Sequence, residues 1–235
     1  MNEELNTPET EVPAEISAHE SAADEPAAAA SDEKQPEKPE KEPYTAADLL
    51  DDVLDLIETV ICSIFVVLLL FTFVFCIAAV DGPSMEPTLL NEQRLVVSRL
   101  QRTYENGDIL IIDCPETTVM MQDGSLIHGT GLGKRIVKRL IAQEGQVVNI
   151  DFANGIVYVD GQALDEPYTS APTFNDNGAL MYPFTVPEGY YFVLGDNRPI
   201  SMDSRDPGVG LVHEESVVGK VVLRILPVSE FGKVE

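Results

Sequence analysis

The chain has 235 residues and a formal net charge of −25, with 40 acidic residues against 15 lysines and arginines. A nucleic-acid-binding surface needs clustered lysine and arginine, and a chain this acidic offers no such cluster, so nucleic acid is excluded as a partner. The three cysteines have no spacing typical of a disulfide framework or of a metal site. We therefore expect no metal and no other cofactor.

The first 43 residues are rich in Glu, Ala, Pro and Ser and contain almost no large apolar side chain. Such a segment cannot bury enough apolar surface to offset the entropy of ordering, so we predict a disordered acidic tail over residues 1–43. Eighteen acidic residues and three lysines precede Val60, which places about 15 of the 25 net negative charges before that residue. The tail could bind a partner, but a solvated tail without a specific ligand is the simpler interpretation.

Residues 44–80 are predicted to form an amphipathic lead-in and a single transmembrane helix. Thr45 and Asp48 have the spacing of a helix-capping pair, and the apolar run extends from Val60 to Val80. Its 21 residues at about 1.5 Å each give roughly 30 Å, the thickness of a bilayer's hydrocarbon core. A cleavable secretory signal would be shorter, basic at its start and N-terminal, so we favour a permanent anchor. The nearby lysines and arginines do not indicate on which side the N-terminus lies.

Residues 81–230 are predicted to fold as one mainly β domain, followed by a short C-terminal tail at 231–235. Short β-branched and aromatic runs are bounded by Gly, Pro, Asn or Asp, and no long amphipathic helical pattern separates them. The pairs Asn154-Gly155 and Asp160-Gly161 are typical of hairpin turns. We expect antiparallel sheets or a partial barrel. The expected strands are 95–98, 108–112, 147–150, 156–159, 190–194 and 217–223, and the expected surface loops are 115–133 and 168–188.

Ser84 lies four residues after the apolar run, in the sequence Gly82-Pro-Ser-Met-Glu-Pro-Thr-Leu, so a potential nucleophile is placed close to the membrane surface. A serine hydroxyl is a poor nucleophile unless a neighbouring base accepts its proton. None of the three histidines has a recognisable catalytic context: His19 lies in the acidic tail, His128 in a Gly-rich segment and His213 beside two glutamates. A Ser-His-Asp triad is therefore not the favoured arrangement.

A lysine is the alternative base, because burial disfavours the ammonium form and lowers its pKa. In the sequence Gly133-Lys-Arg-Ile-Val-Lys-Arg-Leu-Ile, a strand would place Ile136, Lys138 and Leu140 on one face, with Lys138 between two apolar side chains. Lys134 shares that face but lies at its polar end. A surface lysine on an edge strand is the ordinary interpretation of either residue, and spacing alone leaves the alternatives open.

A third polar cluster, Gly195-Asp-Asn-Arg-Pro-Ile-Ser-Met-Asp-Ser-Arg205, follows an aromatic strand. An ordinary polar loop held by Asx turns and ion pairs is one interpretation. Ser201, Asp203 and Arg205 recur at every second position, which would direct their side chains to one side of an extended segment. A hydroxyl there could orient a neutral lysine, and an Asp–Arg pair could brace the loop.

In these three segments the chain resembles the bacterial type I signal peptidases, membrane-anchored serine proteases that remove signal peptides from exported proteins. The resemblance covers the anchor and the domain from Gly82 to about Leu226. The family's motifs are matched at Gly82–Leu89, at Gly107–Ile109, at Lys138–Arg139 with Gly145, and at Gly195–Arg205. Four motifs in the family's order make a specific signal.

The resemblance selects between the two lysines. Family members carry a glycine seven residues after the catalytic lysine, and Gly145 stands at that distance from Lys138, whereas Ile141 stands there for Lys134. The resemblance thus implies Ser84 as the nucleophile and Lys138 as the general base. Further assigned roles are lysine orientation by Ser201, the oxyanion site or substrate cleft for Gly82 and Met85, and support of the site by Arg139, Gly195, Asp196, Asn197, Arg198, Asp203 and Arg205.

The chain also departs from the family's pattern. Ala142 and Gln146 stand where the family usually has Gly and Asp, which affects the local turn more than the chemistry. Gly82 has no hydroxyl where some members use a serine to bind the oxyanion, so the backbone N–H of Ser84 is the one donor we can name.

The resemblance implies a plasma-membrane protein with a cytoplasmic N-terminus and an extracytoplasmic catalytic domain. It implies preprotein signal peptides as substrates, with membrane lipid and the secretion translocon nearby. A self-cleaving Ser-Lys protease of the repressor type would have no reason to carry an anchor. A membrane-tethered binding module with degenerate motifs would be expected to lack Ser84 or Lys138, and both are present.

Overall fold

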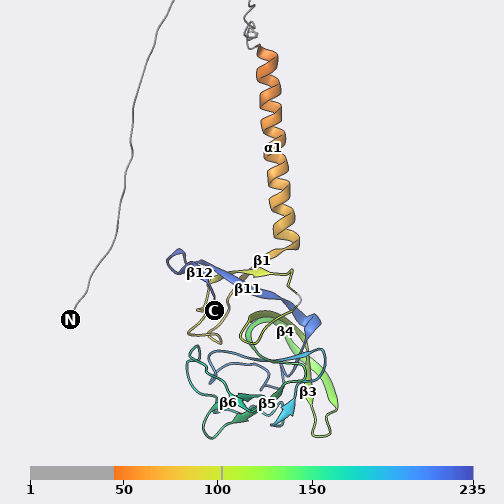
Figure 1. Cartoon of the computed structure of the whole chain (residues 1–235), viewed down its shortest axis with the longest axis vertical. Helices are drawn as coiled ribbons and strands as arrows, with labels where there is room; N and C mark the ends of the chain where they lie inside the picture. Colours follow the sequence, from red (N-terminus) through yellow and green to blue (C-terminus); the bar gives the residue numbers. More distant parts are fainter. Residues whose placement is uncertain (1–44, 102, 235) are drawn as a thin grey trace, which may run out of the picture. The chain divides into compact units, whose positions relative to one another are not determined.

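The computed structural model describes residues 45–101 and 103–234, so the predicted acidic tail lies outside the described residues. The helix α1 (Ala46–Phe73) precedes a mainly β domain (Figure 1). At the start of α1, the Asp48 carboxylate accepts hydrogen bonds from the Thr45 N–H and hydroxyl, both at 2.7 Å. The Thr45 hydroxyl oxygen accepts the Asp48 N–H at 3.4 Å. The predicted capping pair therefore forms.

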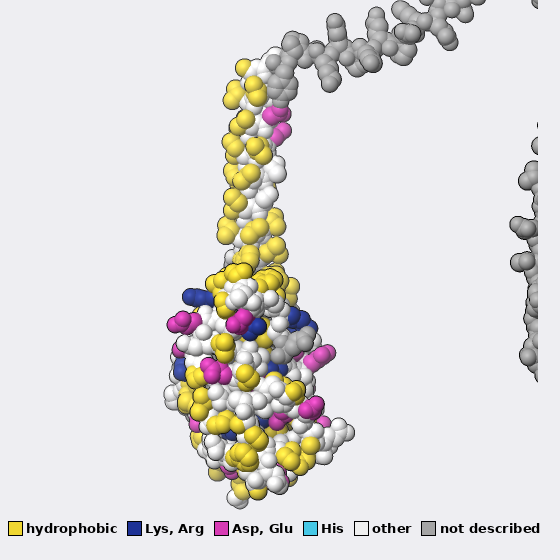
Figure 2. Space-filling view, turned by 90° about the vertical axis from the view of Figure 1, so that its left-hand side faces the viewer, with side chains coloured by type: hydrophobic (Ala, Val, Ile, Leu, Met, Phe, Trp, Pro, Cys, Tyr) yellow, Lys and Arg dark blue, Asp and Glu magenta, His cyan; other side chains and the backbone are white. Residues whose placement is uncertain are grey.

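The helix α1 is long and apolar enough to cross a membrane, and its 28 residues bury none of their side chains in the protein. Figure 2 shows hydrophobic side chains along α1. After Glu58 the helix carries no charged residue and is apolar on all sides. Such a helix needs an apolar environment around it, which fits a membrane anchor.

The prediction that the apolar run is helical as far as Val80 was wrong. The helix ends at Phe73, and Phe75–Ala79 form strand β1, which pairs antiparallel with β2 (Arg94–Ser98). In β1 the backbone N–H and C=O groups find hydrogen-bond partners in β2. A short apolar sequence is compatible with a strand as well as with a helix. Composition alone could not separate the two outcomes.

The domain consists of two antiparallel sheets, as the sequence predicted. One has eight strands in the order β1-β2-β11-β3-β4-β9-β10, with β12 also paired to β11, and the other has four in the order β7-β6-β5-β8. In the described part of the chain neither sheet closes into a barrel. The remaining strands are β3 (Ile109–Met120), β4 (Leu126–Gln143), β5 (Val147–Asp151), β6 (Ile156–Val159), β7 (Gln162–Ala163), β8 (Phe184–Thr185), β9 (Tyr190–Leu194), β10 (Val212–His213), β11 (Val217–Leu226) and β12 (Gly232–Lys233). Two short 3-10 helices are η1 (Glu214–Ser216) and η2 (Val228–Glu230).

All six predicted strands are present, but the predicted loop 115–133 is wrong. Strands β3 and β4 continue through most of it as a long hairpin, in which Thr117 pairs with Gly129. A Cβ at Gly131 would lie within 2.7 Å of the backbone of Glu116. Gly131 therefore allows close approach of the two strands, and it does not mark an irregular loop.

One predicted turn and one predicted loop are present, whereas the C-terminal segment differs from the prediction. Asp160 and Gly161 both have positive φ, 52° and 77°, and join β6 to β7 as the predicted hairpin. Segment 168–188 is irregular apart from β8, as expected. Within the predicted tail 231–235, Gly232 and Lys233 pair with β11 and are not free. The β domain thus extends past residue 230.

One of the three hydrophobic clusters anchors the segment that carries Ser84. Met85 and Leu89 are buried in this cluster together with Leu95 and Val97 of β2. Burying a side chain of this size stabilises the fold by roughly 1.5–3 kcal/mol, so the turn that follows Ser84 is fixed to the sheet.

Candidate active site

The predicted nucleophile and base are in direct contact. Lys138 lies on β4, and its Nζ donates a hydrogen bond to the Ser84 Oγ at 2.8 Å. Ser84 lies in the connection between β1 and β2, 54 positions away in the sequence. This distance is within the reach needed for proton transfer between a nucleophile and its base.

The surroundings of Lys138 favour its neutral form. The residue is 2% exposed, and burial lowers the pKa of Lys138 from 10.5 to about 8. The carboxylates of Asp203 and Asp196 raise this pKa, while the positive charges of Lys134 and Arg205 lower it. Desolvation is the largest effect, so a substantial fraction of the amine is neutral in mildly alkaline solution.

The loop that begins at Gly195 holds the backbone of the nucleophile segment. The Asn197 N–H donates to the Ser84 carbonyl oxygen at 3.0 Å, and its side-chain amide donates to the Pro83 carbonyl at 3.1 Å. A Cβ at Gly195 would lie 2.6 Å from the Ser84 carbonyl oxygen and would also collide with the Ser201 side chain. The close packing of these two segments therefore requires glycine at position 195.

The expected hydrogen bond between Ser201 and the lysine is not formed. Ser201 is 3% exposed, and its Oγ has no hydrogen-bond partner among residues 45–101 and 103–234. Its side chain lies against Gly195, while the Lys138 amine contacts Ser84. A buried hydroxyl without a partner is uncommon in folded proteins, so Ser201 stands out as an unsatisfied group beside the dyad.

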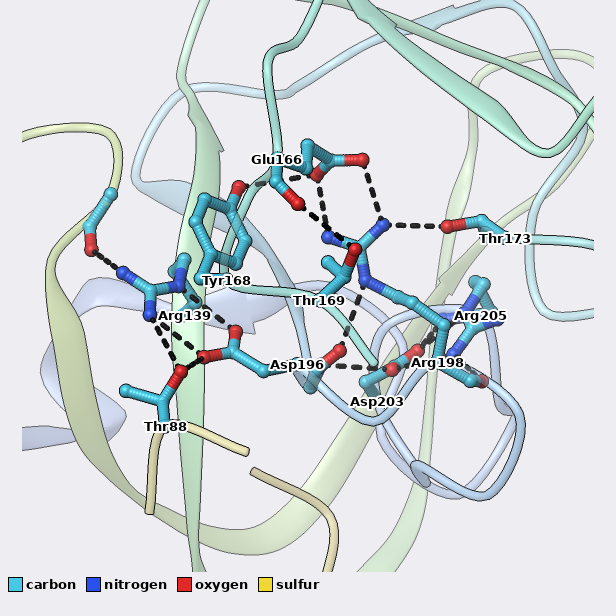
Figure 3. Close-up of polar contacts among 12 residues, drawn as sticks. Thr88, Arg139, Glu166, Tyr168, Thr169, Thr173, Asp196, Arg198, Asp203 and Arg205 are labelled. Atoms are coloured by element: carbon cyan, nitrogen blue, oxygen red, sulfur yellow. Dashed lines mark hydrogen bonds and ion pairs between the residues drawn. The ribbon is translucent and has the colours of Figure 1, made fainter. Parts of the chain in front are cut away.

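An ion pair joins the lysine strand to the 195–205 loop (Figure 3). The Arg139 guanidinium binds Asp196 through two hydrogen bonds, of 2.9 and 2.7 Å, and both side chains are buried. Asp196 also accepts the Thr88 hydroxyl at 2.5 Å, and Arg139 donates to the Gly107 carbonyl at 2.8 Å. The Tyr168 ring lies 3.9 Å from the Arg139 guanidinium carbon. These contacts link all four motifs recognised in the sequence.

Two further arginines brace the same loop. The Asp203–Arg205 pair expected from the sequence forms, with bonds of 2.9 and 2.8 Å, and neither side chain is exposed. Arg198 binds the Glu166 carboxylate through two bonds and also donates to the Thr173 hydroxyl at 2.6 Å (Figure 3). Bidentate pairs of this kind fix orientation as well as distance.

Several of these partners were not predicted from the sequence. Glu166, Tyr168 and Thr173 lie in or beside an irregular segment with no motif, and their contacts with the arginines span 25 positions or more. Thr88 lies inside the nucleophile motif, but nothing in its spacing indicated a bond to Asp196.

A groove of about 480 Å³ opens beside the dyad. Residues 76–85 line one side of it, including Gly82 and Met85, which the sequence assigned to the cleft. Residues 134–138 of β4 line the other side, and Ile200 and Met202 also contribute. Strand β9 pairs with β4 only from Arg139 onward, so in the described structure the preceding part of β4 has one unpaired edge.

The backbone N–H of the nucleophile is free to donate a hydrogen bond. The Ser84 N–H has no acceptor within the described ranges. The Gly82 N–H is already bound to the Asn91 side-chain oxygen at 2.8 Å. Gly82 has a φ of 91°, a conformation that favours glycine, and therefore shapes the entry to the nucleophile turn.

Neither described histidine belongs to this site. His128 contacts Thr118, His213 lies near Glu215, and neither lines the groove. Among the residues that the structure describes, no group of three or more His, Cys, Asp or Glu side chains could hold a metal ion.

Comparisons with known proteins identify the family of this chain. The family model described as "Signal peptidase, peptidase S26" matches residues 53–226. Signal peptidase I of Bacillus licheniformis is 32% identical over 194 residues, which cover 79% of this chain and 95% of that protein. A probable signal peptidase I-1 of Synechocystis sp. is 36% identical over 157 residues, covering 66% and 72%. Signal peptidase I S of Bacillus subtilis is 30% identical over 191 residues, covering 77% and 93%. The chain therefore belongs to the signal peptidase family, peptidase S26, of serine peptidases that act on signal peptides.

Proposed function

We propose that this chain is a membrane-anchored endopeptidase that removes signal peptides from exported preproteins, with Ser84 as nucleophile and Lys138 as general base. The observation that carries the proposal is the 2.8 Å contact between the Lys138 amine and the Ser84 hydroxyl. The low exposure of Lys138 supports it, because only a neutral amine can accept the proton.

The reaction begins when neutral Lys138 accepts the Ser84 proton and the Ser84 oxygen attacks the carbonyl carbon of the scissile peptide bond. The carbonyl oxygen becomes an oxyanion, to which the Ser84 N–H donates. The intermediate collapses, the C–N bond breaks, and the Lys138 ammonium returns its proton to the leaving amine. Water then attacks the acyl-enzyme while Lys138 accepts the water's proton. The bond between the acyl carbon and the Ser84 oxygen breaks, the Lys138 ammonium returns the proton to that oxygen, and the signal peptide leaves with a free carboxyl group.

The groove fits an extended peptide as substrate. The unpaired edge of β4 before Arg139 offers backbone groups to which an added strand could bond. The groove beside it has walls with apolar side chains such as Met85 and Ile136. Shallow apolar pockets of this kind would select small side chains at the first and third positions before the cut.

The apolar helix α1 serves in this proposal as a permanent anchor. The N-terminus lies in the cytoplasm, and the catalytic domain lies outside the plasma membrane. That arrangement places Ser84, eleven residues after the end of α1, where signal peptides emerge near lipid and the translocon.

The test is preprotein processing by the full chain in membranes or detergent. Ser84→Ala and Lys138→Ala should each abolish cleavage, because each removes one partner of the dyad. Lys134→Ala is the matched control, since Lys134 lies on the same strand and lines the same groove but does not contact Ser84. Inactivation by Lys134→Ala with retention by Lys138→Ala would overturn the assignment. Cleavage of the chain itself, with no processing of preprotein, would favour a self-cleaving protease instead.

A further inference from the structure

The nucleophile segment is also held by Arg224 of β11, which does not line the groove. The Arg224 guanidinium donates to the Thr88 carbonyl oxygen at 3.2 Å and, through its Nε, to the Glu230 carbonyl oxygen at 2.7 Å. Glu230 is the last residue of η2. One guanidinium therefore joins β11, the segment after it and the nucleophile segment.

Gln93 completes this contact. It is 2% exposed, and its side-chain amide donates to the Glu230 carboxylate at 2.7 Å. Its side-chain oxygen accepts the Leu90 N–H at 3.1 Å, and its backbone carbonyl accepts the Val80 N–H at 2.9 Å. Gln93 thus joins the two ends of the connection that carries Ser84, through Val80, and links them to Glu230.

Thr88 connects these contacts to the dyad. Its carbonyl oxygen binds Arg224, and its hydroxyl donates to Asp196, the partner of Arg139. Arg139 directly follows the base Lys138 on β4, and Thr88 lies four residues after Ser84. A shift of Thr88 would therefore disturb the nucleophile's position relative to its base.

We propose that Arg224, Gln93 and Glu230 form a C-terminal clamp that positions Ser84 against Lys138. They are positioning residues, because none of the three lines the groove. Glu230 also lies beyond residue 226, where the family match ends, so this part of the clamp lies outside the matched segment.

The connection that carries Ser84 needs a restraint such as the clamp. The connection between β1 and β2 is irregular, and an unrestrained irregular segment samples many conformations. A displacement of about 1 Å between reacting groups can cost on the order of 100-fold in rate. Asp196 and Asn197 hold the connection through the Thr88 hydroxyl and the Pro83 and Ser84 carbonyls, and the clamp holds it through the Thr88 carbonyl and Gln93.

This inference rests on the proposed function, and its test compares three full-length variants: Arg224→Gln, Arg224→Lys and Arg94→Gln. Arg94→Gln is the matched control, because Arg94 is an exposed arginine of the same sheet, opposite Leu226 of β11. The readouts are kcat and KM for preprotein cleavage, the pH profile, acylation of Ser84 by a small electrophilic ester, and the thermal midpoint.

Arg224→Gln should lower kcat and the acylation rate about tenfold or more, with KM within about twofold and the apparent pKa of the profile unchanged. Arg224→Lys should restore part of the rate, since one ammonium can still reach the Thr88 carbonyl. Arg94→Gln should match the unsubstituted chain. Glu230→Gln, which keeps the side chain's size, should show a smaller loss that is not additive with Arg224→Gln.

Rates for Arg224→Gln equal to those for Arg94→Gln would overturn the clamp. So would a loss of kcat fully explained by the fraction of unfolded protein, or additive losses in the double variant. If the unsubstituted chain cleaves no preprotein, the proposed function fails, and the acylation rates alone decide the clamp.

Discussion

Gly195 and Ser84 pack so closely that a Cβ on Gly195 would stand 2.6 Å from the Ser84 carbonyl oxygen. Gly195 directly follows β9 and lies 111 positions after Ser84 in the chain. The position of the Ser84 backbone therefore depends on the lack of a side chain at residue 195. The Gly195 N–H in turn donates to the Asp203 carboxylate at 3.0 Å, so the buried Asp203–Arg205 pair fixes the glycine itself.

Gly195→Ala should therefore remove most of the peptidase activity. The new methyl group would displace either the Ser84 carbonyl or the Ser201 side chain, and a shift of about 1 Å in the nucleophile is expected to reduce kcat on the order of 100-fold. Steady-state cleavage of a preprotein measures the effect. Gly232→Ala is the control, because a Cβ there meets no atom within 4 Å. Equal activity of the two variants would show that the close approach is unimportant.

The activity of the unsubstituted chain should rise with pH through an apparent pKa near 8. Burial lowers the pKa of Lys138 to about 8, and the reaction requires the neutral amine. Below pH 7, kcat/KM should fall about tenfold for each unit of pH. A pH–rate profile between 6 and 10 measures this limb. Full activity below pH 6 would contradict a lysine base.

The same lowered pKa makes a prediction about stability. The unfolded chain holds a proton on Lys138 up to about pH 10.5, whereas the folded chain releases it near 8, so the unfolding free energy should rise between these values. The difference between the two pKa values corresponds to about 3 kcal/mol of unfolding free energy. Below pH 8 the folded protein is less stable by this amount, because it buries a charged amine. Lys138→Met should remove this rise in denaturant titrations from pH 7 to 10.5. Lys134→Met, at an exposed lysine, should retain it.

Substitution of Asp196, the buried partner of Arg139, should lower both the stability and the activity of the protein. Asp196→Asn leaves the Arg139 charge buried and unpaired, which typically costs about 3–5 kcal/mol of stability. It also removes the charged acceptor of the Thr88 hydroxyl, so cleavage should fall along with the thermal midpoint. Glu188→Gln serves as the control, since that carboxylate is exposed. Equal midpoints for the two variants would argue against a structural role of the pair.

The sequence identified the residues whose signals are local. Lys138 was selected by a glycine seven residues away, and the structure shows that it contacts Ser84. Glu166 and Tyr168 were missed because their contacts with arginines join segments that only the fold brings together. The end of α1 at Phe73 was missed because Phe75–Ala79 are equally suited to a helix and to a strand, and pairing with β2 decides between them.

Substitution of Ser201, whose hydroxyl is unpaired in the described structure, should affect stability and catalysis differently. Ser201→Ala removes a buried group that makes no hydrogen bond in the described structure, so the thermal midpoint should stay the same or rise. Ser204→Ala is the matched comparison, because Ser204 is equally buried but its Oγ accepts the Val193 N–H at 3.0 Å. Loss of that bond should cost about 1–3 kcal/mol and lower the midpoint. If Ser201 orients the lysine amine during the reaction, Ser201→Ala should lower kcat despite its unchanged stability. A midpoint for Ser201→Ala as low as that for Ser204→Ala would show that the Ser201 hydroxyl is bonded in the folded protein.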